Sequence, residues 1–116
     1  MMRKFFSFII AIFFCLSVQN VFAHPPVRVD ISYDAPTKTV TAVIVHPVAD
    51  PKTHYIEKVD VSVNGKEIMD EKFTSQQNAN SDTVTYKLKD VKPGDVVGIE
   101  GYCNIFGKKE STITIK

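Results

Sequence analysis

Apolar and polar side chains alternate along much of residues 27–115, and this period of two limits the fold more than any other feature of the sequence. Such alternation is typical of strands that bury one face, whereas an amphipathic helix repeats about every 3.6 residues. The first run has its apolar members at Val27, Val29, Ile31 and Tyr33. A second run, residues 39–46 (TVTAVIVH), is β-branched and almost continuously apolar, as a central strand would be. This region therefore predicts strands and no helix.

Turn signals divide the region into short strands. Asn64-Gly65 is the strongest signal, because both residues tolerate the positive φ of a type I′ hairpin turn. Residues 92–95 (KPGD) place Pro and Gly where a type II turn needs them, and the polar residues 74–82 predict a solvated loop. The expected strands are residues 27–33, 39–46, 55–63, 66–73, 84–88, 96–103 and 111–115. This pattern predicts an all-β fold, a seven-stranded antiparallel immunoglobulin-like β-sandwich.

The first 23 residues have a different composition and predict a signal peptide. Arg3 and Lys4 precede an apolar run at residues 5–18, and residues 21–23 (VFA) form a cleavage site. The run is shorter than the about 20 residues that span a bilayer. We therefore expect a signal peptide at 1–23 and one domain at 24–116, exported to the periplasm or secreted. The alternative is an uncleaved N-terminal anchor helix.

Removal of that segment changes the charge and the cysteine count. Of the 14 basic residues 12 remain, against 13 acidic ones, so the net charge becomes −1. So few positive charges do not indicate nucleic-acid binding, and no membrane contact is expected after cleavage. Cys103 is then the single cysteine, so no intramolecular disulfide can form. Because thiols outside the cytoplasm are usually paired or bound to a metal, Cys103 is a candidate functional residue.

The remaining candidates are the three histidines, which also fall at strand ends or in loops. His46 ends an expected strand, His54 opens the next one, and His24 would be the first residue of the exported domain. A rigid sandwich can bring such positions together. Taken singly, each has an ordinary interpretation as a solvated histidine or a small buried cysteine. No GxSxG, phosphate-binding glycine loop or HExxH helix motif is present.

Two segments together resemble the iron site of the desulfoferrodoxin and superoxide reductase family. They are His46-Pro47 with His54-Tyr55-Ile56-Glu57, and Cys103-Asn104-Ile105 with Gly107. The resemblance covers roughly residues 24–107 and implies a seven-stranded immunoglobulin-like sandwich that holds a mononuclear iron, Fe²⁺ or Fe³⁺. In that family four histidines bind iron equatorially and a cysteine thiolate binds axially. The resemblance implies that the metal ligands here are His24, His46, His54 and Cys103.

The sequence departs from the family pattern at three points. Phe106 stands where the family has its last histidine, so one equatorial ligand is missing. The loop between His46 and His54 is about two residues longer than usual, and the lysine and glutamate that precede the early histidine in the family are absent. We expect the new α-amino group of His24 to supply one positive charge after cleavage.

The resemblance implies a superoxide reductase, an oxidoreductase if the metal site is intact, with superoxide and an unidentified electron donor as partners. Zinc or copper would also suit three histidines and one cysteine. One alternative is a non-catalytic immunoglobulin-like binding or structural module with a degenerate metal site, in which Phe106 packs as a core or rim aromatic. The other is a periplasmic copper- or zinc-binding protein.

Overall fold

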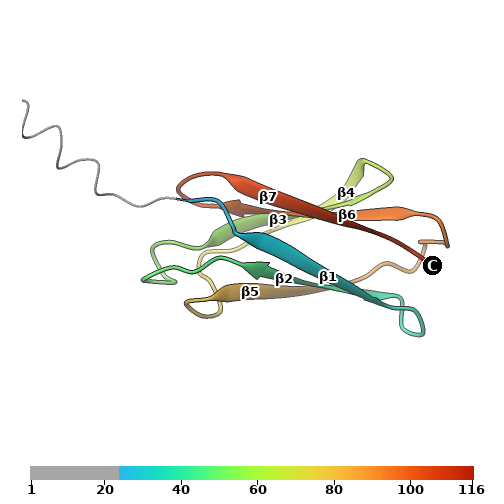
Figure 1. The fold of residues 1–116 in the computed structure, drawn as a ribbon, viewed down its shortest axis with the longest axis horizontal. Helices are drawn as coiled ribbons and strands as arrows, with labels where there is room; N and C mark the ends of the chain where they lie inside the picture. The colour runs from blue at the N-terminus through green and yellow to red at the C-terminus, as the bar shows by residue number, and fades with distance from the viewer. Residues whose placement is uncertain (1–23) are drawn as a thin grey trace, which may run out of the picture.

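The computed structural model describes residues 24–116, and within this range it contains seven antiparallel strands in two sheets (Figure 1). The strands are β1 (Arg28–Asp34), β2 (Thr39–Val45), β3 (Ile56–Val63), β4 (Lys66–Lys72), β5 (Ser81–Lys87), β6 (Val96–Cys103) and β7 (Lys108–Thr114). One sheet has the order β1-β2-β5 and the other β4-β3-β6-β7. The predicted all-β, seven-stranded sandwich is therefore confirmed. The expected signal peptide, residues 1–23, lies outside the described residues.

The two predicted turns have the backbone that their sequences require. Asn64 and Gly65 both have positive φ, 53° and 84°, and connect β3 to β4. Gly94 has a φ of 96°, as the third position of a type II turn demands. The first turn joins β3 to β4 as a hairpin, and the Asn64 side chain bonds Asp95 and Val96 beside the second turn, where β6 begins.

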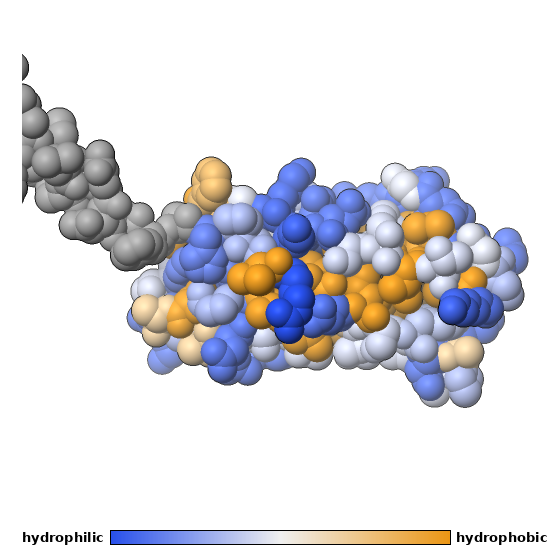
Figure 2. Space-filling view, viewed as in Figure 1, coloured by the Kyte–Doolittle hydropathy of each residue, from blue (hydrophilic) through white to orange (hydrophobic). Residues whose placement is uncertain are grey.

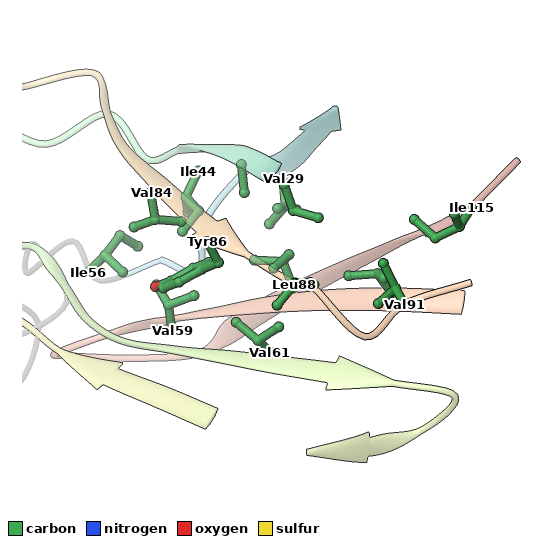
Figure 3. Packing of buried hydrophobic residues seen from close by; sticks show 14 residues of the cluster. Val29, Ile44, Ile56, Val59, Val61, Val84, Tyr86, Leu88, Val91 and Ile115 are labelled. Atoms are coloured by element: carbon green, nitrogen blue, oxygen red, sulfur yellow. The ribbon is translucent and has the colours of Figure 1, made fainter. Parts of the chain in front are cut away.

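The core lies between the two sheets and consists mainly of β-branched residues. Figure 3 shows Ile44 and Val84 of the smaller sheet facing Ile56, Val59 and Val61 of the larger one. Side chains of this size each contribute about 1.5–3 kcal/mol when fully buried. The apolar face of every central strand is thereby removed from water.

At one side of the sandwich, β1 lies against β7 (Figure 1). Figure 2 shows apolar side chains gathered in a band along the middle of this face, with polar side chains around them. Ile31, Tyr33 and Ile113 of these two strands are partly buried and pack against the core. The seam between the sheets is thus closed by side chains rather than by backbone pairing.

The alternation of strand directions brings four connections to one end of the sandwich (Figure 1). They are residues 24–27, 46–55, 73–80 and 104–107. The first carries His24 and the second carries His46 and His54, while Cys103 is the last residue of β6, directly before the fourth. Residues 24–116 contain no helix long and apolar enough to cross a membrane.

The structure corrects the expectation that residues 74–82 form a solvated loop. Gln76 is buried in that segment, and Asp82 is buried as the second residue of β5. Polar side chains gave no apolar alternation there, so the sequence pattern did not reveal either burial. The strand β7 also begins at Lys108, three residues earlier than expected.

Candidate metal centre

Three histidines lie together at the end of the sandwich just described, and we call them the histidine cluster. His24 precedes β1, His46 follows β2 directly, and His54 lies two residues before β3. The first two therefore come from the smaller sheet and the third from the larger one. Positions 22 and 8 residues apart in sequence meet because β1 and β2 are paired and β3 starts in the facing sheet. The structure thus brings His24, His46 and His54 together, and their role as metal ligands stays a prediction.

The rings of the histidine cluster are mutually close. Their centroids are 5.0 Å apart for His24 and His46, 5.2 Å for His24 and His54, and 4.8 Å for His46 and His54. One nitrogen of each ring lies within 4.8 Å of the other two. Three imidazole nitrogens at such a separation need only small ring movements to reach the roughly 2 Å ligand distances of a common metal ion.

The His54 ring has a nitrogen that the protein leaves without a partner. Its Nε2 is buried and accepts or donates no hydrogen bond. Burial lowers the pKa of His54, and positive charge on His46 and His24 would lower it further. A neutral ring with a free nitrogen lone pair is the form of histidine that binds metals.

Both ring nitrogens of His24 face backbone carbonyl oxygens. Nδ1 lies 2.9 Å from the oxygen of Pro25, and Nε2 lies 3.0 Å from that of Pro47. A neutral imidazole has one N–H, so it can donate to one of these carbonyls at a time. The other nitrogen keeps a lone pair at the edge of the cluster.

His46 is the fully buried member of the histidine cluster. Its Nδ1 lies 2.8 Å from Oε1 of Gln76, and the Gln76 amide also bonds the backbone of His46. Sequence reasoning missed Gln76, because it lies in an irregular segment with no motif and no periodic pattern. A glutamine in a polar run gives no signal of burial.

Cys103 lies at the end of β6, in a segment that we call the cysteine turn (residues 103–107). Cys103 is buried and pairs with Ile56, two residues after His54. The amides of Ile105 and Phe106 donate to its Sγ at 3.4 and 3.5 Å. Cys103 is not one of the three residues of the close histidine cluster, and its role as a ligand stays a prediction.

Asn104 ties the cysteine turn to His54. Its side-chain oxygen accepts the Tyr55 N–H at 2.9 Å, and its amide donates to the Thr53 carbonyl at 3.1 Å. The residues on both sides of His54 are thereby held by one side chain. The Cys-Asn pair of the sequence thus acts as a structural link between β6 and the start of β3.

The position where the resemblance expects a fourth histidine holds an exposed aromatic ring. Phe106 is 62% exposed, and its neighbour Ile105 is 49% exposed. Phe106 is therefore a rim residue and contributes nothing to the core. Next to it, Gly107 has a φ of 84° and lies so close to Pro25 that an added Cβ would come within 2.7 Å of the proline Cβ.

The histidine cluster opens to solvent through a shallow hollow of about 580 Å³. It is lined by His24, Pro47, Val48, Ala49 and His54. No Lys, Arg, Asp or Glu side chain is among the residues that line it. The opening gives an ion or small molecule access to the imidazole edges of His24 and His54.

These residues fit a transition-metal ion. Within residues 24–116 the buried Nε2 of His54 has no hydrogen-bond partner, a bound metal would satisfy it, and imidazole suits iron, zinc and copper alike. A nearby thiol adds a softer donor of the type that binds such metals as a thiolate. The fold and the site together define a small β-sandwich with a histidine-rich potential metal site.

Solved structures that are similar in fold to this chain include superoxide reductases. A superoxide reductase (1Fe-SOR) from Giardia intestinalis matches with a TM-score of 0.60 and 14% identity, over 79% of this chain and 100% of that one. A superoxide reductase in the oxidised state matches with a TM-score of 0.57 and 17% identity, over 84% and 94% of the two chains. A superoxide reductase (neelaredoxin) from Ignicoccus hospitalis matches with a TM-score of 0.52 and 22% identity, over 77% and 78%. The chain thus shares the superoxide reductase fold over most of its length.

No protein-family model matches the sequence, and no curated protein matches it significantly. The resemblance that the sequence motifs suggested is thus matched by a similarity of fold to solved superoxide reductases.

Proposed function

We propose that this protein is an exported, desulfoferrodoxin-like domain that binds one iron ion and reduces superoxide. The observation that carries the proposal is the histidine cluster, with its unpartnered His54 nitrogen, at one end of a superoxide reductase-type sandwich. His24, His46 and His54 would hold the metal through nitrogen, and Cys103 through sulfur. Export rests on the sequence of residues 1–23 alone.

The division of labour among the residues follows from their surroundings. A ferrous ion in this site would supply one electron to superoxide, which takes up two protons and leaves as hydrogen peroxide, and an external donor would then restore the ferrous state. His46 is buried and fixes the inner side of the site, while His24 and His54 border the hollow through which superoxide enters. The amides of Ile105 and Phe106 donate to the Cys103 sulfur and hold it in place at the end of β6.

The decisive experiment is loading with iron. Protein comprising residues 24–116 is prepared with ferrous iron without oxygen, its metal content is measured, and it is then oxidised. The proposal predicts one iron per chain, a thiolate-to-ferric charge-transfer band, and superoxide consumption that yields hydrogen peroxide without oxygen. Absence of bound iron would contradict it.

Cys103→Ser tests the sulfur ligand separately. The band should disappear while iron stays bound through the histidine cluster. If Cys103 has no metal role, the substitution changes only the stability, by about 1 kcal/mol as is usual for a small buried residue. Retention of the band would exclude Cys103 as the ligand.

A second candidate function is binding of zinc or copper. The observation that favours it is the exposed Phe106, since it leaves three close imidazoles, a set that zinc uses in catalytic sites with a water as fourth ligand. Competition between ferrous iron, zinc and cuprous or cupric copper, followed by elemental analysis, distinguishes the two. A chain that binds none of them would be the non-catalytic binding or structural module.

A further inference from the structure

Gln76 is a buried polar side chain that the proposed site does not use as a ligand. It is 5% exposed and lies in the connection between β4 and β5, far from His46 in sequence. Its backbone N–H donates to the Pro51 carbonyl at 3.0 Å, which anchors it to the loop between His46 and His54. Burial of an amide at this point needs a reason, since each unmet hydrogen bond there would be costly.

The orientation of the Gln76 amide is fixed by what surrounds its nitrogen. Nε2 lies 2.8 Å from the carbonyl oxygen of His46 and 3.0 Å from that of Asn78. Carbonyl oxygens only accept, so the NH₂ group must face them both. The Gln76 Oε1 atom is therefore directed to the opposite side, where it accepts the Ile56 N–H at 3.2 Å.

This orientation decides which nitrogen of His46 carries the hydrogen. The His46 Nδ1 atom lies 2.8 Å from Gln76 Oε1, which is an acceptor, so Nδ1 must donate. In a neutral imidazole the other nitrogen then has a lone pair. The competing contact of Nε2 is to the His24 carbonyl oxygen, and it is longer, at 3.3 Å.

We propose that Gln76 is a positioning residue that holds buried His46 in its Nδ1–H tautomer and turns its Nε2 lone pair toward His24 and His54. Metal-binding histidines generally need such a partner on the second nitrogen, and loss of that partner typically weakens metal affinity about 10–100-fold. The inference deepens the proposed function, because it rests on a metal binding at the histidine cluster. The tautomer itself can be measured without any metal.

The first test uses the unsubstituted, metal-free protein. Long-range ¹H–¹⁵N correlation of ¹⁵N-histidine-labelled protein at a pH of about 8, where histidine is neutral, reports which nitrogen of His46 is protonated. We expect the Nδ1–H form. Finding Nε2–H would overturn the inference even if metal binds, whereas a chain that binds no metal but shows Nδ1–H would overturn the proposed function alone.

The second test compares three variants. Gln76→Leu removes the acceptor and should give mixed His46 tautomers and an affinity for Zn²⁺ about 10–100-fold lower, measured against a chromophoric chelator. Gln76→Glu keeps an acceptor for Nδ1 and should retain the His46 tautomer, although it loses the NH₂ donors to the His46 and Asn78 carbonyls. Gln77→Leu is the matched control, because Gln77 is exposed and its side chain bonds only the backbone of Thr83 and no histidine.

Circular dichroism and thermal unfolding of each variant separate folding from positioning. A folded Gln76→Leu with the tautomer and Zn²⁺ affinity of the unsubstituted protein would overturn the inference. The inference would also be overturned if Gln77→Leu lowered the Zn²⁺ affinity as much as Gln76→Leu does.

Discussion

The histidine cluster and the cysteine turn lie at the same end of the sandwich but are supported in different ways. The cluster has a fully buried member, His46, whose ring and backbone are both bonded by Gln76. The cysteine turn also buries its sulfur among amide donors, yet its next two side chains, Ile105 and Phe106, are largely exposed. Hydrogen bonds from a buried side chain thus hold His46 in the cluster. In the cysteine turn only Cys103 is buried, and the two residues after it face solvent.

The two regions are nevertheless coupled through two contacts. Asn104 bonds the residues on either side of His54, and Gly107 packs against Pro25, next to His24. A change in the cysteine turn can therefore reach the histidine cluster without touching a ring. The comparison also indicates that the histidine cluster can keep its arrangement although position 106 is not a histidine. Gln76, from another connection, holds His46 in place.

Removal of an imidazole should produce the largest effect. In His54→Ala the nitrogen that faces the cluster without a partner is lost, so Zn²⁺ or Fe²⁺ affinity should fall by more than the about 100-fold typical of losing a supporting contact. Equilibrium competition with a chelator measures this. Lys52→Ala, an exposed position in the same loop, is the control and should bind normally. Unchanged affinity in His54→Ala would place the metal elsewhere.

A histidine returned to the cysteine turn should have the next largest effect. Phe106→His restores the imidazole of the family pattern at a site where the phenyl ring is mostly in water, so the fold should tolerate it. We expect metal affinity to rise at least about tenfold. Ile105→His, an equally accessible neighbour, should not reproduce the gain. Equal tightening by both variants would mean that position 106 has no special direction toward the metal.

Gly107→Ala should disturb both regions, with a moderate cost in stability. A non-glycine residue at this φ of 84° costs about 1–3 kcal/mol, and the new Cβ would also displace Pro25. Gly65→Ala is an unusually close control, because Gly65 has the same φ of 84° with no atom within 4 Å of the added Cβ.

Denaturant unfolding gives the free energy of unfolding of each variant. The loss in Gly65→Ala measures the cost of the positive φ, and the additional loss in Gly107→Ala measures the clash with Pro25. Metal affinity should fall only in Gly107→Ala, because only there does the N-terminal segment with His24 move. If both variants bind metal equally well, the contact between Gly107 and Pro25 does not reach the cluster.

The smallest expected effect is a pH dependence of the metal-free protein. The pKa of His54 is lowered in the folded state by burial and then by charge on His46 and His24. The unfolded chain, with a His54 pKa of about 6.5, therefore binds more protons, so stability should fall as the pH drops below about 6.5. His54→Asn should flatten this slope, which is read from the free energy of unfolding between about pH 7.5 and 5.5. A slope that is the same in both proteins would exclude His54 as its source.

Prediction from sequence succeeded where side chains repeat or turns demand a particular residue. The alternating runs gave all seven strands, and Asn64-Gly65 and Gly94 adopt the positive φ that their turns require. The start of β7 was placed three residues late, because Lys108, Lys109 and Glu110 are exposed on an edge strand and give no apolar signal. The equally exposed strand β4 was found through the Asn64-Gly65 turn before it rather than through an apolar face.

The sequence predicted which histidines belong to the candidate site, but it did not predict the contacts that hold them in place. The three histidines could be grouped because each follows or precedes a strand, and strand alternation puts such positions at one end. Gln76 could not be predicted, since its burial depends on the path of an irregular connection between β4 and β5. Asp82, the second residue of β5, was missed because polar side chains give no apolar alternation there, and burial raises the pKa of its carboxyl.

The histidine cluster has a mechanical consequence, because its members come from both sheets. His24 and His46 flank strands of the smaller sheet and His54 precedes a strand of the larger one, so an ion held by all three would cross-link the two layers at their open end. In residues 24–116, where Cys103 has no second cysteine to pair with, coordination would take the place of a disulfide. Such a link adds about 2.7 kcal/mol when the free ion is at 100 times its dissociation constant. Unlike a covalent bond, it would be removed by a chelator and restored by the ion.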